Sequence, residues 1–287
     1  MVYYIKSDIW TKSRNFVRID HIYCHKIAIL YCFFLKRTKD RLLISVVIPA
    51  KDEVGNIGPL MIEICHALQG LTEFEIVVVD DGSSDNTFDE IITTGQQMNC
   101  NAHAIRHNAS TGQSTAIYTA VHHAKGQYIV TLDADGQNDP ADIPAMLALL
   151  PNINSPHFCI AGYRKNRKDT AWKRFQSRFA NKVRDALLHD GVPDTGCGLK
   201  LFPRETFLRF PYFNHMHRYI PALVRRMGGE ILISEVNHRD RTVGVSKYTA
   251  WNRAWVGIVD ILGVMWLIRR SKIVNISKAT QTNKAEE

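Results

Sequence analysis

The segment Leu42-Leu-Ile-Ser-Val-Val-Ile48 is a run of apolar and β-branched residues that ends at Pro49. A continuous apolar run of this length is typical of a strand that is buried on both faces of a parallel sheet. Residues 56–69 follow with apolar side chains at helical spacing, and Glu75-Ile-Val-Val-Val-Asp80 is a second apolar run. The sequence on either side of Pro49 therefore predicts a strand, a helix and a second strand.

The same alternation continues along the chain. We expect further strands at 102–106, 128–132, 158–161 and 231–236, and helices at 85–98, with Asp85 as N-cap, and at 115–125, 140–150 and 217–227. This spacing predicts an α/β fold, with a mostly parallel sheet covered by helices on both faces, over residues 42–250. Because ligands of such sheets bind beyond the carboxyl ends of the strands, the residues after each strand are the candidates for function.

Composition limits the class of protein. The chain has 287 residues, of which 45% are hydrophobic and 22% charged, and these fractions exclude bulk disorder and a polytopic membrane protein. A net charge of +8 favours a polyanionic partner, which is nucleic acid, an anionic membrane or a phosphorylated ligand. The six cysteines form no Cys-x-x-Cys pair, which indicates a reducing compartment.

Carboxylates follow three of the predicted strands. The first strand ends in Pro49-Ala-Lys-Asp-Glu53, the second in Asp80-Asp81-Gly-Ser-Ser-Asp-Asn-Thr87, and the fourth in Asp133-Ala-Asp135-Gly-Gln137. Their mutual repulsion at one sheet edge would raise their pKa values unless a positive group were present. Hard oxygen ligands of this kind suit Mg²⁺ or Mn²⁺, and a divalent ion that also holds a diphosphate would neutralise both sets of charge.

With these motifs, residues 43–250 resemble the family 2 glycosyltransferases with the GT-A fold, a Rossmann-like fold that binds nucleotide sugars, and specifically their dolichol-phosphate mannosyltransferase branch. Pro49 to Glu53 is similar to Pro-x-x-Asn-Glu, with Asp52 in place of the Asn, and Asp80 to Thr87 is similar to Asp-Asp-Gly-Ser-x-Asp-Gly-Thr, with Asn86 in place of a Gly. The other two motifs are Asp-Ala-Asp-x-Gln, at 133–137, and a late Arg-x-x-Gly-x-Ser-Lys, at 241–247.

The resemblance implies that the enzyme binds a nucleotide sugar, either a GDP-hexose or a UDP-hexose. Pro49, Glu53 and one or both of Asp80 and Asp81 would hold the base and the ribose of this donor. Asp133 would also help to bind the nucleotide.

The resemblance also implies the catalytic and metal-binding residues. Asp135 and Gln137 would take the metal, and Arg164 would meet the diphosphate or the acceptor phosphate, so that Asp133, Asp135 and Arg164 are the expected catalytic residues. Arg241 and Lys247 would close over the donor diphosphate.

A basic amphipathic helix predicted over 171–188 is the candidate acceptor site. In the family an Arg stands four residues before the helix Ser; here Lys173 precedes Ser177, which leaves open whether Lys173 or Arg174 binds the acceptor phosphate. The implied acceptor is a polyprenyl phosphate, dolichyl or undecaprenyl. Its phosphate is already anionic near neutral pH, so it needs positive groups rather than a general base.

The two ends of the chain point to a membrane surface. Residues 1–41 carry an apolar run, 27–35, with basic flanks, and form either an extension without fixed structure or a segment on a membrane. Residues 251–270 predict an interfacial helix, with a buried core helix as the alternative, because the apolar stretch 254–268 is too short to span a bilayer and has Trp and Arg at its ends. A polar tail, 271–287, follows. The expected location is the cytoplasmic face of a membrane.

The leading hypothesis is a metal-dependent inverting transferase that moves a hexose, mannose or glucose, to polyprenyl phosphate. The first alternative is transfer to a saccharide or glycolipid in cell-envelope polysaccharide synthesis, which requires an Asp or Glu base, for which Asp194 is the one candidate. The remote alternative is a basic nucleic-acid-binding protein. No recognised module interleaves aromatic and basic residues, so we expect no nucleic-acid partner.

Overall fold

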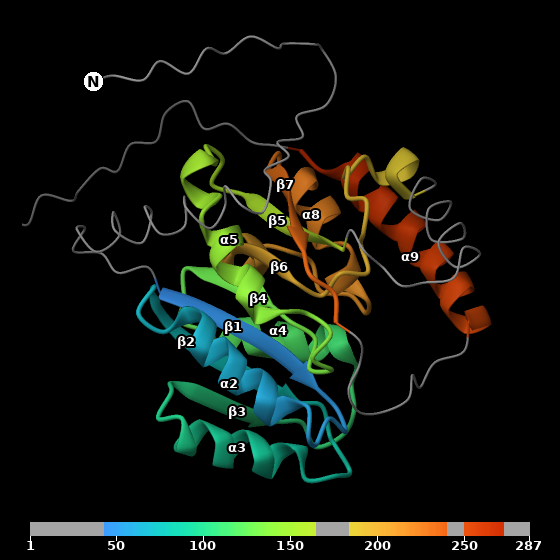
Figure 1. Ribbon diagram of the computed structural model, residues 1–287. Coiled ribbons are helices and arrows are strands. Elements are labelled where there is room, and N and C mark those ends of the chain that lie inside the picture. The colour runs from blue at the N-terminus through green and yellow to red at the C-terminus, as the bar shows by residue number, and fades with distance from the viewer. Residues whose placement is uncertain (1–42, 165–183, 240–249, 273–287) are drawn as a thin grey trace, which may run out of the picture.

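The computed structural model describes residues 43–164, 184–239 and 250–272, with side chains described from residue 257 onward in the last range. One sheet runs through the middle of the molecule, and helices lie on each side of it (Figure 1). Four of the predicted features lie wholly or mostly outside the described residues. They are the N-terminal extension 1–41, the helix 171–188, the late motif 241–247 and the polar tail 271–287.

The sheet has seven strands in the order β3-β2-β1-β4-β6-β5-β7. β1 pairs in parallel with β2 and β4, and β2 pairs in parallel with β3, whereas β6 is antiparallel to both β4 and β5. β5 and β7 are parallel to each other. The strands are β1 (Leu43–Ala50), β2 (Glu73–Asp80), β3 (Ala102–Arg106), β4 (Tyr128–Thr131), β5 (Phe158–Arg164), β6 (Lys200–Pro203) and β7 (Glu230–Val236). The predicted mostly parallel sheet is confirmed.

Helices cover both faces of this sheet, as the sequence predicts. On one face lie α2 (Ile57–Leu68), α3 (Thr87–Gln97) and α5 (Ile143–Leu147). On the other lie α4 (Gln113–His123), α7 (Arg204–Leu208) and α8 (Ile220–Arg226), and α9 (Ala250–Arg270) packs outside α8. Short 3₁₀ turns occur at Pro140–Asp142 (η1), Leu150–Asn152 (η2) and Met216–Arg218 (η3).

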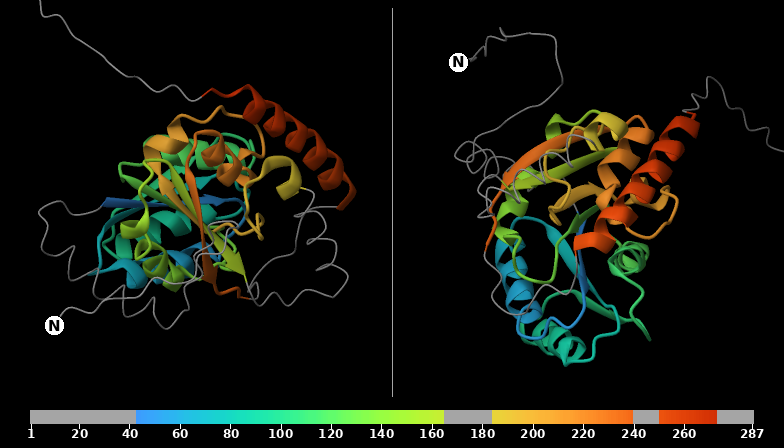
Figure 2. Two further views of the ribbon diagram at one scale, coloured as in Figure 1. Left: turned by 90° about the horizontal axis from the view of Figure 1, so that it is seen from above. Right: turned by 90° about the vertical axis from the view of Figure 1, so that its right-hand side faces the viewer.

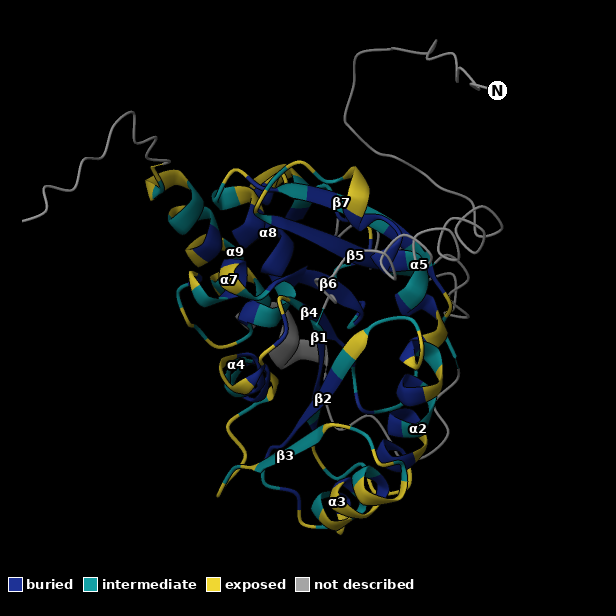
Figure 3. Cartoon of the chain, turned by 90° about the vertical axis from the view of Figure 1, so that its left-hand side faces the viewer, coloured by how far each residue is buried: buried dark blue, intermediate teal, exposed yellow. Residues whose placement is uncertain are grey.

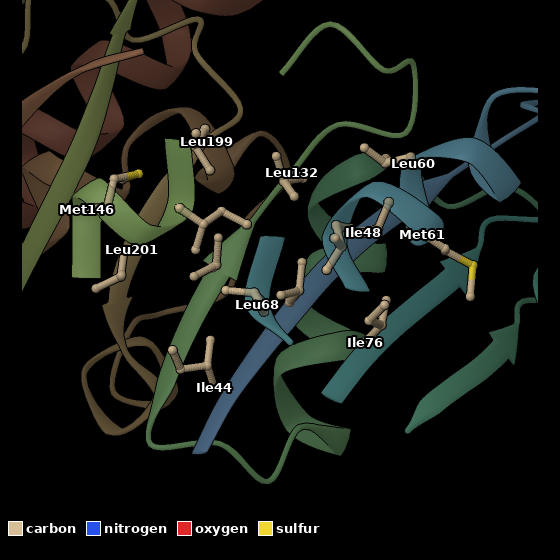
Figure 4. Close-up of a cluster of buried hydrophobic side chains, with 14 of the residues drawn as sticks. Ile44, Ile48, Leu60, Met61, Leu68, Ile76, Leu132, Met146, Leu199 and Leu201 are labelled. Atoms are coloured by element: carbon tan, nitrogen blue, oxygen red, sulfur yellow. The ribbon is translucent and has the colours of Figure 1, made fainter. Parts of the chain in front are cut away.

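Alternate residues of the buried strands supply the two halves of the core. Val46 and Ile48 of β1 contact the cluster under α2 and α5, which Figure 4 shows, while Val47 belongs to the cluster under α4 and α8. All three side chains are fully buried, and Figure 3 shows the central strands in the buried colour. The continuous apolar run of the sequence is therefore explained by a strand that has a core on each face.

Two predicted helices differ from the structure, and proline explains both differences. The helix predicted at 140–150 is instead η1, the five-residue α5 and η2, and each of these three pieces has a proline at its first or second position. The helix predicted at 217–227 begins only at Ile220, next to Pro221. Proline fits the first turn of a helix but cannot continue one, because it has no N–H to donate to the preceding turn.

A buried carboxylate ties the first three strands together. Glu75 of β2 is 0% exposed. Its Oε1 accepts hydrogen bonds from Ser45 Oγ of β1 and from the backbone N–H of Lys125, both at 2.5 Å. Its Oε2 lies 3.3 Å from Nε2 of His103 in β3. This network fixes the lateral order of the strands at the end of the sheet away from the candidate site.

We expect Glu75→Ala to lower the free energy of unfolding by about 3 kcal/mol, because it leaves the buried hydroxyl of Ser45 and the part-buried backbone N–H of Lys125 without their acceptor. Urea unfolding measures this loss. Glu73→Ala is the matched control, since Glu73 is an exposed residue of the same strand, and it should change the stability by less than about 0.5 kcal/mol. Equal effects of the two substitutions would contradict the proposed role of the network.

Candidate functional site

The candidate site lies at the carboxyl edge of the sheet, where the strand order reverses. β1 connects to β2 on one side, whereas β4 pairs with β1 on the other. Loops that leave the parallel strands at such a reversal separate and leave room for a ligand. Because β6 is antiparallel, the loop that precedes it, residues 194–199, reaches the same edge.

Asp133, directly beyond β4, is held on two sides. Its Oδ1 accepts a hydrogen bond of 2.8 Å from Nε2 of Gln113, in the first turn of α4. On the other side the carboxylate faces Gly198, where any Cβ would overlap Oδ2. Burial raises the pKa of Asp133, and the Asp135 carboxylate raises it further, while Lys200 and Arg164 act in the opposite direction.

Asp135 and Gln137 lie in the turn that follows, and their loop is anchored to the end of β7. Oδ1 of Asp135 accepts a hydrogen bond of 3.2 Å from the backbone N–H of Gln137, and the carbonyl of Gln137 accepts one of 3.0 Å from the backbone N–H of Arg239. Buried Asp142 accepts hydrogen bonds from the backbone and side chain of Asn237, at 2.7 and 2.9 Å. Residues 237–239, which precede Arg241 in the chain, are therefore fixed against the loop that carries Asp135 and Gln137.

Arg164, at the end of β5, forms a two-point ion pair with Asp194. Nε and Nη2 of Arg164 donate to Oδ2 and Oδ1 of Asp194 at 2.7 and 2.9 Å. Both side chains are largely buried, 11% and 5% exposed, and this contact with Asp194 helps to raise the pKa of Arg164 although burial alone would lower it. Asp194 is thus engaged as an orienting carboxylate, which disfavours it as a general base for a sugar hydroxyl.

The residues predicted to hold the nucleotide lie around the ends of β1 and β2. Pro49 is partly buried within β1, and Glu53 follows it, with Oε2 accepting a hydrogen bond of 2.8 Å from Nδ2 of Asn56. Asp80 is completely buried and accepts a hydrogen bond from the backbone N–H of Ser83, at 2.8 Å, while Nε of Arg106 lies 3.2 Å from its other oxygen.

Asp81 organises the loop between β3 and α4. Its carboxylate accepts hydrogen bonds of 2.8–2.9 Å from Ser110 Oγ, from the backbone N–H and hydroxyl of Thr111 and from the backbone N–H of Gly112, and it lies 2.8 Å from Nδ1 of His107. Burial alone would raise its pKa, but these donors outweigh burial and lower the pKa to about 2. The structure thus commits Asp81 to shaping the loop that carries the first turn of α4.

Asp52 and Asp85 also join loops at this edge. Oδ1 of Asp52 accepts hydrogen bonds from the backbone N–H and hydroxyl of Ser84, at 2.8 and 3.0 Å. The predicted N-cap Asp85 is wrong by one residue: α3 begins at Thr87, its N-cap is Asn86, and the Asn86 side chain makes no capping hydrogen bond. Asp85, one position earlier, accepts a hydrogen bond of 3.0 Å from the backbone N–H of Thr87.

Several predicted site residues lie outside the described part of the chain. These are the acceptor-phosphate residues Lys173, Arg174 and Ser177 and the late donor residues Arg241 and Lys247. Asp133, Asp135, Gln137 and Arg164 are at one edge of the sheet, as predicted.

Sequence reasoning did not single out Gln113 or Gly198 individually. Gln113 donates to Asp133 from another element, and nothing in its own neighbourhood indicates that contact. Gly198 belongs to the segment Thr195–Lys200, and a glycine there lets another group approach the backbone closely. The approach is to the Asp133 carboxylate.

Among the described residues, no group of three or more His, Cys, Asp or Glu side chains is placed to hold a metal ion by itself. A divalent cation at Asp135 and Gln137 would therefore need further oxygen ligands from another source. The diphosphate of a nucleotide supplies ligands of that kind.

Comparison with known proteins identifies the relatives of this chain. Residues 45–209 match the model of the glycosyl transferase family 2. The dodecaprenyl-phosphate galacturonate synthase of Rhizobium johnstonii is 32% identical over 233 residues, which are 79% of this chain and 67% of that protein.

Solved structures with the same fold are more distant in sequence. The glucosyl-3-phosphoglycerate synthase of Mycobacterium tuberculosis, in complex with Mn²⁺, UDP and phosphoglyceric acid, superposes with a TM-score of 0.62 at 17% identity and covers 85% of this chain and 83% of its own. Its complex with Mg²⁺ and UDP gives 0.61 at 18% identity, over 86% and 84% of the two chains. At this identity the likeness shows the GT-A-like fold.

We expect Asp81→Asn to destabilise the protein by about 2 kcal/mol at neutral pH. The folded-state pKa of Asp81, about 2, lies below the ordinary value of 3.8. Its ionised form therefore adds stability above 3.8, and this contribution is lost as the pH falls toward 2. Urea unfolding at several pH values should show the wild-type advantage shrinking over that interval.

The exposed α3 residue Asp89 provides the control, since Asp89→Asn should leave both stability and its pH dependence nearly unchanged. If the free energies of unfolding of wild type and Asp81→Asn differ by the same amount from neutral to acid pH, the proposed contribution of the Asp81 charge is ruled out.

Proposed function

This chain belongs to the glycosyl transferase family 2, and we propose that it transfers a hexose, with inversion, from a GDP- or UDP-hexose to a polyprenyl phosphate. The observation that carries the proposal is the pair Asp133 and Asp135 at the end of β4, with Arg164 close enough to act on the charge of Asp133. The lipid-phosphate acceptor is supported by the similarity to the Rhizobium johnstonii protein, a dodecaprenyl-phosphate galacturonate synthase.

The residues at this edge fit a divalent cation. Asp135 and Gln137 are hard oxygen donors. Burial raises the pKa of Asp133 and the Asp135 carboxylate raises it further, and a cation beside Asp135 would relieve this second contribution. We assign Mg²⁺ or Mn²⁺ to Asp135 and Gln137, in keeping with the ions in the Mycobacterium tuberculosis complexes. When bound, the ion would neutralise charge that develops on the departing diphosphate.

The donor would lie over the ends of β1, β2 and β4. Pro49 and Glu53 would contact the base and ribose directly. Asp80 and Asp81 would shape that pocket through the loops they hold, because both carboxylates are buried against protein donors.

Arg241 and Lys247 complete the proposed donor site. Arg241 follows Arg239 by two residues, and the backbone of Arg239 is bonded to Gln137.

The acceptor needs positioning rather than deprotonation. A phosphate oxygen is already a nucleophile near neutral pH, and the proposed positive groups around it are Arg164, Lys173 and Arg174, with the Ser177 hydroxyl. Asp194, the one candidate base for a sugar-hydroxyl acceptor, is engaged by Arg164. This contact favours a lipid phosphate over the alternative saccharide or glycolipid acceptor.

A polyprenyl phosphate is held in a bilayer, so we place the enzyme at the cytoplasmic face of a membrane as a peripheral protein. Within residues 43–164, 184–239 and 250–272, no helix combines the length and the apolar character required to cross a bilayer. The excess of basic residues would then serve phosphates and anionic lipid rather than nucleic acid.

The proposal is tested with radiolabelled nucleotide sugars, neutral hexoses and uronic acids of both UDP and GDP, incubated with polyprenyl phosphate in the presence of Mg²⁺ or Mn²⁺. Label that enters the organic phase with one donor identifies donor and acceptor together. Label that instead enters a water-soluble saccharide or a glycolipid would favour the alternative acceptor class.

We expect Asp135→Ala to abolish transfer and its response to Mg²⁺ or Mn²⁺ while leaving the fold intact, because Asp135 is partly exposed and not a core residue. Initial rates across a metal titration measure the loss. Asp89→Ala, on the exposed side of α3, should behave as wild type. The assignment of the metal to Asp135 would be excluded if Asp135→Ala kept its response to metal and an activity within threefold of wild type. A threefold change in rate corresponds to roughly 0.7 kcal/mol in the activation free energy.

We expect Gly198→Ala to lower kcat about 100-fold, because the new methyl group must displace the Asp133 carboxylate that Gln113 holds from the other side. Gly257→Ala is the control, since a Cβ at residue 257 of α9 meets nothing within 4 Å. Far-ultraviolet circular dichroism and the melting temperature establish that both variants fold. A near-wild-type kcat for Gly198→Ala would show that the position of Asp133 is not critical.

A further inference from the structure

The outer side of α9 carries a stripe of large apolar residues that the described part of the chain does not cover. Ile258, Val259, Leu262 and Trp266 are 51%, 55%, 51% and 59% exposed. At 100° per residue these four positions fall within an arc of about 100° on the helix surface. We call them the α9 outer stripe.

A different side of the same helix packs against the protein. Val264 is buried in a cluster with Leu188, Tyr219 and Ala222, and the partly buried side chains of Ile261, Met265 and Ile268 join this cluster. Figure 2 shows α9 at the edge of the molecule, with α8 on its inner side. The packing of α9 is thus satisfied without the outer stripe, and the predicted alternative of a helix buried all round does not hold for residues 257–272.

Basic residues surround one end of the outer stripe. Arg269 and Arg270 end α9 and are exposed, and Lys272 and Arg225 of α8 are exposed beside them. The two helix ends lie together, since Arg226 Nε donates to the carbonyl of Leu267 at 3.3 Å. By helical position Arg269 and Arg270 fall on the same side as the stripe. An apolar stripe with a basic border matches the acyl chains and the anionic headgroups of a bilayer.

A chain of contacts places α9 close to the candidate site. Asp260 of α9 lies 3.0 Å from Nδ1 of His215, whose loop also holds the first turn of α4 through a contact of 2.7 Å between His217 Nδ1 and Ser114 Oγ. The neighbouring residue of that turn, Gln113, donates to Asp133. A lipid whose phosphate reaches Asp133 and Arg164 would therefore come from a bilayer on the α9 side of the molecule.

We infer that the α9 outer stripe lies in the surface of an anionic lipid bilayer, with the Arg269 and Arg270 side chains among the headgroups. This inference rests on the proposed function for the direction from which the acceptor arrives. A second copy of this chain is the competing occupant, and the net charge of +8 on each copy opposes that association while it favours an anionic membrane.

The test is flotation of the full chain with vesicles of phosphatidylcholine, with and without phosphatidylglycerol. Leu262→Ser with Trp266→Ser should weaken partition at least about tenfold on vesicles with phosphatidylglycerol, because two large apolar contacts are lost. Arg269→Glu with Arg270→Glu should weaken it roughly fivefold per residue, only where phosphatidylglycerol is present. Ile92→Ser, which removes an exposed apolar side chain from α3, is the matched control and should bind as wild type.

The inference is overturned if wild type does not bind these vesicles, or if the Leu262 and Trp266 double variant binds as well as wild type. It is also overturned if light scattering shows a wild-type dimer that this variant dissociates, since a second copy would then cover the stripe.

A short-chain, water-soluble prenyl phosphate separates this inference from the proposed function. The double variant should transfer sugar to that acceptor at the wild-type rate and lose transfer to a long-chain acceptor in vesicles. If wild type uses neither acceptor while vesicle binding still depends on the α9 outer stripe, the proposed function is wrong and the assignment of the stripe to the membrane is supported. If both acceptors are used equally by wild type and variant, the function stands and the surface assignment fails.

Discussion

The burial of the Asp133 carboxylate, with the carboxylate of Asp135 close by, is the constraint around which this edge of the molecule is organised. Both follow the buried strand β4, and the Asp133 carboxylate is held by a hydrogen bond from Gln113. Arg164 and Lys200 supply the compensating positive charge, and the pKa of Asp133 remains raised in spite of them. An edge with an excess of negative charge and fixed positive groups beside it is prepared for a cation together with a phosphorylated ligand.

The two positive groups are themselves held in place, Arg164 by the carboxylate of Asp194 and Lys200 by the backbone carbonyl of Cys197. Asp194 fixes the guanidinium of Arg164 at two points, and behind this pair lies another buried ion pair, between Arg184 and Asp190 at 2.9 Å. Removing one partner from such a pair costs more than the pair contributes, because the remaining charge stays buried. The loop from residue 190 to Lys200 therefore orients the guanidinium of Arg164 through Asp194.

Much of this arrangement can be predicted from the sequence, and the remainder has a physical reason for being hidden. Asp133 and Asp135 were found because their position depends only on the strand directly before them. The contacts of Gln113 with Asp133 and of Asp194 with Arg164 cannot be predicted in this way. The partners are 20 and 30 positions apart in the chain, and such a contact depends on which loops the sheet order brings together. The single helix predicted over 140–150 is wrong because the spacing of its apolar residues is helical while its prolines permit only short helical pieces.

The antiparallel strand β6 has an evolutionary consequence. Because β5 and β6 are antiparallel neighbours, the chain between them, residues 165–199, leaves and returns at the same edge of the sheet. The part of this connection before residue 190 can change in length while both strands, and the loop that carries Asp194 and Gly198, keep their partners. The nucleotide half of the fold, from β1 to β4, stays unaltered by such changes. Descendants of one ancestral enzyme could therefore keep the same donor and diverge in what they glycosylate, by exchanging this one insertion.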